Sequence, residues 1–193
     1  MTLDFSYQPH PTRVVFASGA SAGVAQWVET LRCRRALVLT TPQQAADGEA
    51  LAARLGTLAV GTFAGATMHT PVEVTERALL RAAELKADCV VSLGGGSTTG
   101  LGKAMAYRTD IPQIVIPTTY AGSEVTPILG QTENGIKTTV RGEKIVPEVV
   151  IYDPELTLGL PVAMSVTSGL NAIAHAAEGL YAPDRNPITT MMA

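Results

Sequence analysis

Residues 88–103, DCVVSLGGGSTTGLGK, constrain the fold more than any other part of the chain. They open with a short apolar run rich in β-branched residues, as expected for a strand that is buried on both faces of a parallel sheet. Three glycines, Gly94, Gly95 and Gly96, then remove every Cβ where the backbone has to turn. Small and apolar residues at helical spacing follow. The sequence therefore predicts a strand, a glycine turn and a helix in direct succession.

This arrangement favours the binding of an anion. The first turn of a helix leaves backbone N–H groups unpaired, and the helix dipole adds partial positive charge at the same end. We therefore expect the turn at residues 94–97, which includes Ser97, to hold a phosphate group. A tight strand-to-helix connection without a ligand is the alternative. The spacing matches neither the G-x-G-x-x-G fingerprint nor a P-loop, because no Ser or Thr follows Lys103.

Composition argues against several classes of function. Charged residues make up 16% of the chain, the formal net charge is −3, and Lys and Arg do not cluster, so we expect no nucleic-acid partner. No apolar run approaches the length of a transmembrane helix, so we expect no membrane partner either. The two cysteines, Cys33 and Cys89, cannot form a disulfide scaffold, and no signal segment opens the chain. These features lead us to expect a cytoplasmic protein.

Strand and helix patterns alternate through the first part of the chain. The expected strands are residues 13–17, 36–40, 58–63, 89–93 and 111–116. This alternation is typical of an α/β fold with a Rossmann-like parallel sheet that carries helices on both faces. Ligands of such sheets bind at the carboxyl ends of the strands. One rim is therefore expected to collect the loops at residues 40–42, 65–69, 94–97 and 118–123.

The pattern changes after Glu124. Asn134 and Gly135 separate two strand-like segments, and Asn-Gly is the strongest short signal for a β-hairpin. A last strand at residues 149–152 precedes a long helix from Pro161 to about Tyr181. A further helical segment stops at residue 193 without a cap, so the chain has the appearance of a fragment of a longer protein.

Three polar side chains interrupt the apolar composition of the long helix. Asn171, His175 and Glu178 follow one another at spacings of four and three residues, which places them on one face. A polar stripe on such a helix suggests a functional role. For His175, a hydrogen-bonded histidine in the core is the alternative.

Several separated motifs occur in an order that resembles the iron-containing (group III) alcohol dehydrogenase family. They are the GGGS turn, a Pro-Thr-Thr…Gly-Ser-Glu loop, the hairpin, an Asp-Pro pair and an SGxxAxxHxxE helix, which lie at residues 94–97, 117–124, 133–139, 153–154 and 168–178. Within this family, the chain is similar to the members that reduce maleylacetate with NADH or NADPH. The resemblance implies a nucleotide-binding α/β domain over residues 1–158, the first helices of a truncated all-helical domain over 159–193, and a homodimer.

Three departures from the family pattern concern the metal. Metal-dependent members carry Asp at the positions of Asn171 and Gly100, and their PTTxGTGSE loop is shortened here to PTTYAGSE. A neutral amide is a poor replacement for a carboxylate ligand of a divalent ion. The resemblance therefore implies an enzyme that works without a bound metal. A metal-dependent alcohol dehydrogenase and an inactive nucleotide-binding or dimerisation domain are the alternatives.

The resemblance also implies the cofactor site. Gly94, Gly95, Gly96 and Ser97 would hold the pyrophosphate of NADH or NADPH. The adenine, ribose or nicotinamide side would be lined by Thr118, Thr119 and Ser123. Thr40 and Pro42 lie where the adenosine ribose would bind, and the absence of a carboxylate at Thr40 or Thr41 is compatible with either cofactor.

Catalytic and substrate-binding candidates complete this set. His175 is a candidate catalytic residue, because an imidazole can supply a proton or hydrogen bond to an oxygen that gains charge when hydride adds. Lys137, just past the hairpin turn, is a second candidate and would face a substrate carboxylate; an ordinary exposed hairpin lysine is the alternative. The candidate substrate-binding residues are His69, Tyr120, Lys144 and Asn171, with a surface-loop histidine as the alternative for His69.

Overall fold

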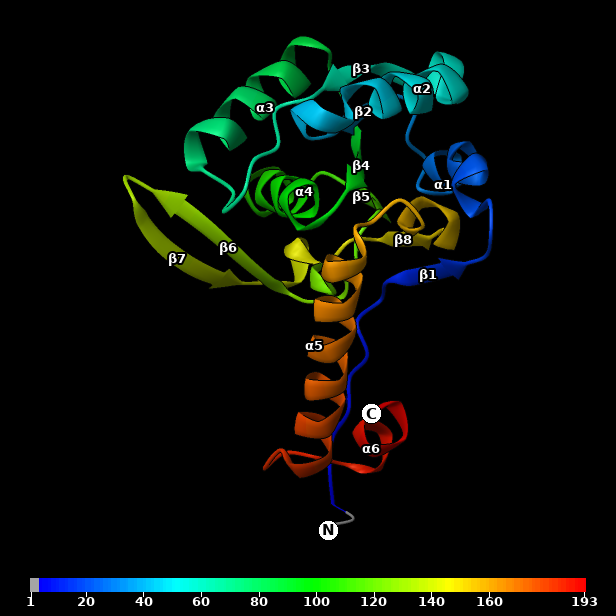
Figure 1. Cartoon of the computed structure of the whole chain (residues 1–193). Coiled ribbons are helices and arrows are strands. Elements are labelled where there is room, and N and C mark those ends of the chain that lie inside the picture. Colours follow the sequence, from blue (N-terminus) through cyan, green and yellow to red (C-terminus); the bar gives the residue numbers. More distant parts are fainter. Residues whose placement is uncertain (1–3) are drawn as a thin grey trace. The chain divides into compact units, whose positions relative to one another are not determined.

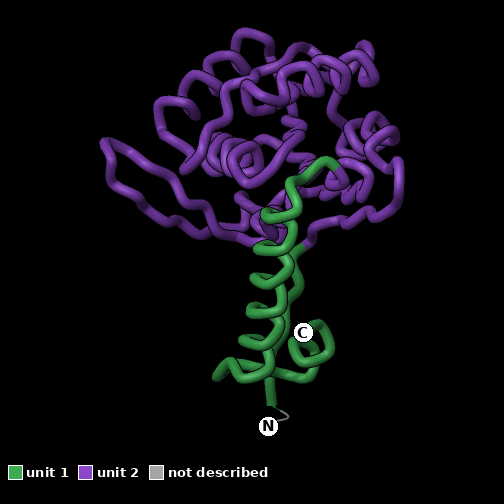
Figure 2. Tube along the Cα trace, in the orientation of Figure 1, with its two compact units in different colours: residues 1–10, 159–193 green, residues 11–158 purple. Residues whose placement is uncertain are grey.

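The computed structural model describes residues 4–193, so residues 1–3 of the expected first domain lie outside the described part. The described residues form two compact units, one of residues 11–158 and the other of residues 4–10 with 159–193 (Figure 2). The expected roles of these parts, a nucleotide-binding domain and the start of an all-helical domain, stay predictions.

A six-stranded sheet forms the centre of the larger unit (Figure 1). Its order is β1-β8-β5-β4-β2-β3, and every neighbouring pair is parallel. This confirms the expected α/β, Rossmann-like fold. The strands are β1 (Arg13–Phe16), β2 (Ala36–Leu39), β3 (Ala59–Phe63), β4 (Cys89–Gly94), β5 (Gln113–Pro117) and β8 (Val149–Tyr152).

Four helices cover the two faces of this sheet. Strand residues alternate between two buried clusters, as expected for a sheet that is covered on both faces. Leu51 packs with Val38 on one face, whereas Leu101 and Met105 pack with Leu37 on the other. The helices are α1 (Val24–Thr30), α2 (Ala45–Leu55), α3 (Val72–Glu84) and α4 (Gly96–Thr109). Short 3-10 helices are η1 (Ala20–Gly23), η2 (Pro42–Gln44), η3 (Gly56–Leu58), η4 (Ser123–Val125), η5 (Glu143–Ile145) and η6 (Pro154–Thr157).

The strand order reverses between β2 and β4. From β2 the chain continues outward to β3, then crosses back to β4 on the other side of β2. As a result α2, which follows β2, and α4, which follows β4, lie on opposite faces of the sheet. The loops that leave these two strands therefore diverge and open a crevice at the carboxyl edge.

The hairpin forms where Asn-Gly predicted it. β6 (Ile128–Glu133) and β7 (Ile136–Arg141) are antiparallel, and Asn134 and Gly135 both have positive φ, 49° and 77°, as a two-residue type I′ turn requires. Leu129 packs with Ala104 of α4, which fixes the base of the hairpin against this helix. The backbone N–H of Thr132 also donates to the carbonyl of Thr70, so the hairpin joins the loop that precedes α3.

The smaller unit contains the two last helices, α5 (Val162–Tyr181) and α6 (Pro187–Met192). The Asn186 side chain caps α6 by accepting hydrogen bonds from the backbone N–H groups of Ile188 and Thr189. None of the residues of α5, all of which the structure describes, is buried. Within residues 4–193, no helix combines the length and the apolar character needed to cross a membrane.

Candidate functional site

The glycine turn after β4 forms as a sharp change of direction. Gly94 has φ 151°, a conformation that L side chains rarely adopt, and a Cβ there would lie 2.5 Å from Thr98 Oγ1. Gly95 is the N-cap residue of α4, and no described side chain caps this helix. Ser97 lies inside the first turn of α4 rather than at its cap. The backbone at the start of α4 therefore stays open to a ligand from outside the chain.

Two neighbouring loops pack against this turn. The N–H of Thr118, just after β5, donates to the carbonyl of Gly94 over 3.0 Å. The Gln44 side chain, after β2, donates from Nε2 to Thr118 Oγ1 over 3.2 Å. A Cβ at Gly95 would lie 2.8 Å from both Cγ2 and Oγ1 of Thr119, so this glycine is needed for the close approach. The loops after β2, β4 and β5 thus form one continuous surface at the crevice.

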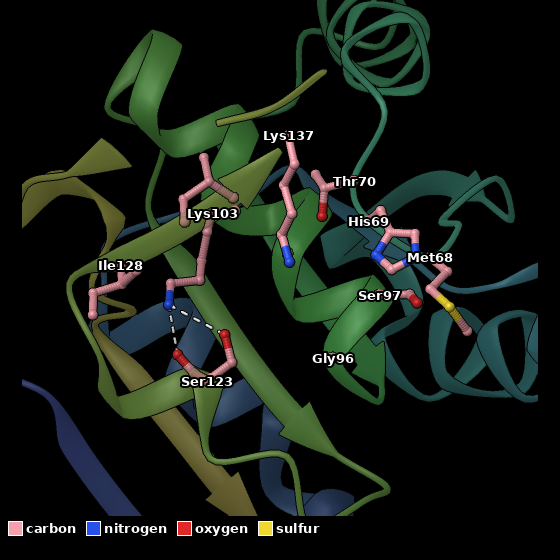
Figure 3. Close-up of a pocket in the computed structure, with 12 residues that line it drawn as sticks. Met68, His69, Thr70, Gly96, Ser97, Lys103, Ser123, Ile128 and Lys137 are labelled. Atoms are coloured by element: carbon pink, nitrogen blue, oxygen red, sulfur yellow. Dashed lines mark hydrogen bonds between the residues drawn. The ribbon is translucent and has the colours of Figure 1, made fainter. Parts of the chain in front are cut away.

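A pocket of about 340 Å³ opens beside the start of α4 (Figure 3). Its walls come from four parts of the larger unit: the loop before α3, helix α4, the start of η4 and the hairpin. The lining residues are Met68, His69, Thr70, Gly96, Ser97, Gly100, Lys103, Ser123, Ile128, Leu129, Gly130 and Lys137.

The lining of this pocket is cationic. Lys103 and Lys137 contribute their ammonium groups, His69 adds an imidazole, and no lining residue in the described part of the chain carries a carboxylate. In Figure 3 the Lys137 side chain extends from the hairpin toward the space that Lys103 and Ser97 also line. Positive side chains beside a helix N-terminus suit an anionic ligand.

Lys103 is the residue that sequence reasoning missed. Its side chain is fully buried, and Nζ donates to the carbonyl of Ser123 over 2.5 Å and to Thr126 Oγ1 over 3.1 Å. Burial lowers the pKa of Lys103 from 10.5 to about 8, against the opposing effect of the Glu124 carboxylate. A single charge among the small and apolar residues 100–106 was the available signal, because lysine is rarely fully buried without a role.

The Glu124 carboxylate close to Lys103 is itself buried and engaged. Its Oε1 accepts a hydrogen bond of 2.8 Å from the hydroxyl of Tyr152 on β8. Burial, together with this carboxylate, raises the pKa of Tyr152. The buried Lys103 of α4 and the buried Glu124 of η4 therefore lie close to each other, and Lys137 and His69 contribute further basic side chains to the pocket lining.

Five residues chosen from the sequence meet at this pocket: Gly96, Ser97, Ser123, His69 and Lys137. Their assigned roles stay predictions. His69 has φ 67° and an exposed side chain in the loop that precedes α3. Gly94, Gly95, Thr118 and Thr119 lie at the adjoining glycine turn, as described above.

The remaining candidates of the larger unit lie outside the pocket lining. Thr40 is buried and packs against Gly48 of α2, so its side chain does not face the rim where a ribose was expected. Pro42 is exposed at the start of η2. Tyr120 is exposed and donates to Thr157 Oγ1 over 3.0 Å. Lys144 forms an exposed ion pair with Asp110, with 3.4 Å between Nζ and Oδ2.

Asn171 and His175 belong to the smaller unit. Both are exposed on α5, and His175 Nδ1 lies 3.6 Å from Glu178 Oε2 one turn along the same helix. The face predicted from their spacing is therefore present. The role of His175 stays a prediction.

Among the described His, Cys, Asp and Glu residues, one group of three can bring its ligand atoms together, namely Cys33, Asp88 and Cys89, and it does not include His175. It lies at the first residue of β4, at the opposite end of the strand from the glycine turn. Burial raises the pKa of both thiols, which disfavours the thiolate that a metal would bind. This group does not belong to the candidate site.

The parallel sheet with a glycine turn at its point of reversal defines a Rossmann-like α/β protein. Residues 11–154 match the iron-containing alcohol dehydrogenase family, and the chain belongs to that family.

Within this family, the relatives of high sequence identity include several maleylacetate reductases. A maleylacetate reductase of Rhizobium sp. (strain MTP-10005) is 71% identical over 189 residues, which is 98% of this chain and 54% of the relative. A maleylacetate reductase of Sphingobium indicum is 57% identical over 191 residues, again with 54% of its length covered. The crystal structure of a maleylacetate reductase from Agrobacterium tumefaciens superposes with a TM-score of 0.97 at 69% identity, covering 99% of this chain and 55% of that one. The chain thus spans about half the length of these relatives.

Proposed function

We propose that this chain is the nucleotide-binding half of an enzyme that reduces maleylacetate to 3-oxoadipate with NADH or NADPH. The observation that carries the proposal is the cationic pocket beside the open N-terminus of α4, at the point where the strand order reverses. The high identity to maleylacetate reductases supports the choice of substrate. The activity itself would require the remaining half that such relatives contain.

The residues at the crevice fit a nicotinamide nucleotide. Gly95 allows Thr119 to pack against the glycine turn, and the start of α4 offers backbone N–H groups to a pyrophosphate. Thr118, Thr119 and Ser123 would line the rest of the cofactor. The buried Thr40 and half-buried Thr41 place no carboxylate after β2, so a 2′-phosphate would meet no repulsion there. When bound, the reduced nicotinamide supplies the hydride.

The substrate is a dianion with a keto group conjugated to a double bond. Lys137 and His69 would bind one of its carboxylates in the pocket, because both line it and neither is balanced by a lining carboxylate among the described residues. Addition of hydride to the double bond moves negative charge to the keto oxygen, and a nearby cation or proton donor lowers this barrier. We propose His175 as that donor, with Asn171 as a hydrogen-bonding neighbour one turn away.

We propose that catalysis does not use a metal, although the family takes its name from iron. The polar face of α5 carries Asn171, His175 and Glu178, and the Glu178 carboxylate lies 3.6 Å from His175 Nδ1. Metal-dependent members of the family carry Asp at the position of Asn171, and a neutral amide is a poor replacement for a carboxylate ligand of a divalent ion.

We also propose a cytoplasmic homodimer that pairs through β1. This strand is an edge of the sheet, and Val14 and Phe16 on it are 55% and 73% exposed. Exposed edge strands with apolar side chains readily pair with another chain. Cys33 and Cys89 are both free thiols, as in a reducing compartment.

The test uses a chimera in which the C-terminal half of the Rhizobium relative follows residue 193. Maleylacetate-dependent oxidation of NADH is measured with and without a strong chelator. We expect activity that resists chelation, and a KM for maleylacetate that rises roughly tenfold or more in Lys137→Met. Arg141→Met removes an exposed cation from the same strand and should leave KM unchanged. Loss of activity on chelation, or a preference for simple alcohols, would favour a metal-dependent alcohol dehydrogenase instead.

A further inference from the structure

Lys103 connects two segments that the proposed cofactor site needs. It lies on α4, the helix that begins at the glycine turn, and its ammonium donates to oxygens of Ser123 and Thr126. A weaker contact of 3.4 Å reaches Ser123 Oγ. Ser123 ends the loop at residues 118–123, which begins against Gly94 through Thr118. The loop is thus anchored at one end to the last residue of β4 and at the other end to the middle of α4.

A carboxylate one turn before Lys103 on α4 could neutralise the lysine, but Thr70 leaves no room for a side chain there. Gly100 lies one turn before Lys103, and a Cβ there would collide with Thr70 Oγ1. Thr70 is buried in this position with φ 46°, held in part by the bond from Thr132 N–H to its carbonyl. An acidic side chain at residue 100 therefore cannot enter without displacing Thr70.

The charged and titratable groups that face Lys103 come from three other segments. Glu124 lies on η4 and is already hydrogen bonded to Tyr152. Lys137 reaches the same pocket from β7, and His69 does so from the loop before α3. Lys103 is thus a buried cation with one partly engaged carboxylate beside it, and an anionic ligand in the pocket would favour its charged form.

We propose that Lys103 is a positioning residue for the bound nucleotide, and this inference rests on the proposed function. Its ammonium holds Ser123 and the loop at residues 118–123 against α4. The turn that receives the pyrophosphate and the loop that lines the rest of the cofactor then keep one fixed geometry. Loss of the charge leaves the loop free to move away from α4, and the site has to be reassembled each time a nucleotide binds.

The experiment measures NADH binding to the 193-residue chain by fluorescence titration between pH 7 and 9.5. Lys103→Met should weaken binding roughly ten- to hundredfold at pH 7, the effect of losing hydrogen bonds from a charged group. Thr126→Val keeps the lysine and removes one acceptor, and it should weaken binding in the same direction by less. Lys86→Met, which changes an exposed lysine between α3 and β4 that lies outside the pocket lining, is the matched control.

The pH profile separates positioning from a merely structural role. Wild-type affinity should fall above about pH 8, by at most about tenfold per pH unit, as Lys103 loses its proton. This slope should persist in Lys137→Met and His69→Asn and disappear in Lys103→Met. Equal affinity and equal slopes in wild type, Lys103→Met and Thr126→Val would overturn the inference. Failure of the wild-type chain to bind NADH at any pH would instead refute the proposed function.

Discussion

Replacing Gly95 by alanine tests whether the loops after β4 and β5 form one packed surface. Gly95 has φ −89° and ψ −157°, a backbone conformation that alanine adopts without strain, so the substitution tests space alone. The new Cβ would lie 2.8 Å from Cγ2 and Oγ1 of Thr119 and 3.4 Å from its Cβ. Overpacking of this kind costs about 1–3 kcal/mol, and the reduced freedom of the unfolded chain returns about 0.4–1 kcal/mol. We expect a net loss of about 1–2 kcal/mol in the free energy of unfolding.

The matched variant is Gly95→Ala with Thr119→Ala. Removing Cγ2 and Oγ1 leaves only the contact at 3.4 Å, which small shifts can accommodate. The two substitutions should therefore couple by about 1–2 kcal/mol in a double-mutant cycle. Urea unfolding followed by the fluorescence of Trp27, the single tryptophan, gives all four stabilities. Additive effects, or no loss in Gly95→Ala, would refute the close approach of the two loops.

Two further predictions concern pH and stability. The pKa of Lys103 is about 8 in the folded chain and 10.5 when unfolded, so between these values the unfolded state binds more protons and stability rises with pH. The free energy of unfolding should increase by up to about 3 kcal/mol across this window, and Lys103→Met should lack the increase; a flat profile in the wild type would contradict the burial of the charge. For Asp153, burial would raise the pKa, but hydrogen bonds from Ser21, Gly19 and Glu155 outweigh it and leave the pKa below its ordinary 3.8. Its contribution is present above pH 3.8 and lost as pH falls through the lowered pKa, so Asp153→Asn should remove part of the acid sensitivity measured by urea unfolding at acidic pH.

The sequence predicted those parts of the fold that depend on local patterns. Three successive glycines identified the turn after β4, because Gly94 adopts a φ that other residues avoid. Asn134 and Gly135 identified the hairpin for the same kind of reason. Alternating strands and helices identified the parallel sheet, whose carboxyl edge then had to collect the candidate loops.

Contacts between residues far apart in the sequence could not be predicted from local patterns. α4 is buried along much of its length, from Thr98 to Ala106, so no polar stripe shows which side faces the pocket. The contact between Lys103 and Ser123 joins residues that are 20 positions apart and depends on the path of the loop after β5. Thr40 looked like a rim residue at the end of a strand, but Gly48 on α2 leaves room for its side chain to turn inward.

The central claim is that the open start of α4 binds the phosphates of a nicotinamide nucleotide. Gly96 is exposed at the first position of α4, and a Cβ there would meet only Ala121, at 3.6 Å, among the described residues. Gly96→Asp places a negative charge where the helix dipole favours it, so the chain should remain folded. Gly96→Asn is the neutral control of the same shape. NADH titration of the two variants should show affinity that is lost in Gly96→Asp and largely kept in Gly96→Asn, whereas equal affinity in both would show that the nucleotide phosphates do not bind at this turn.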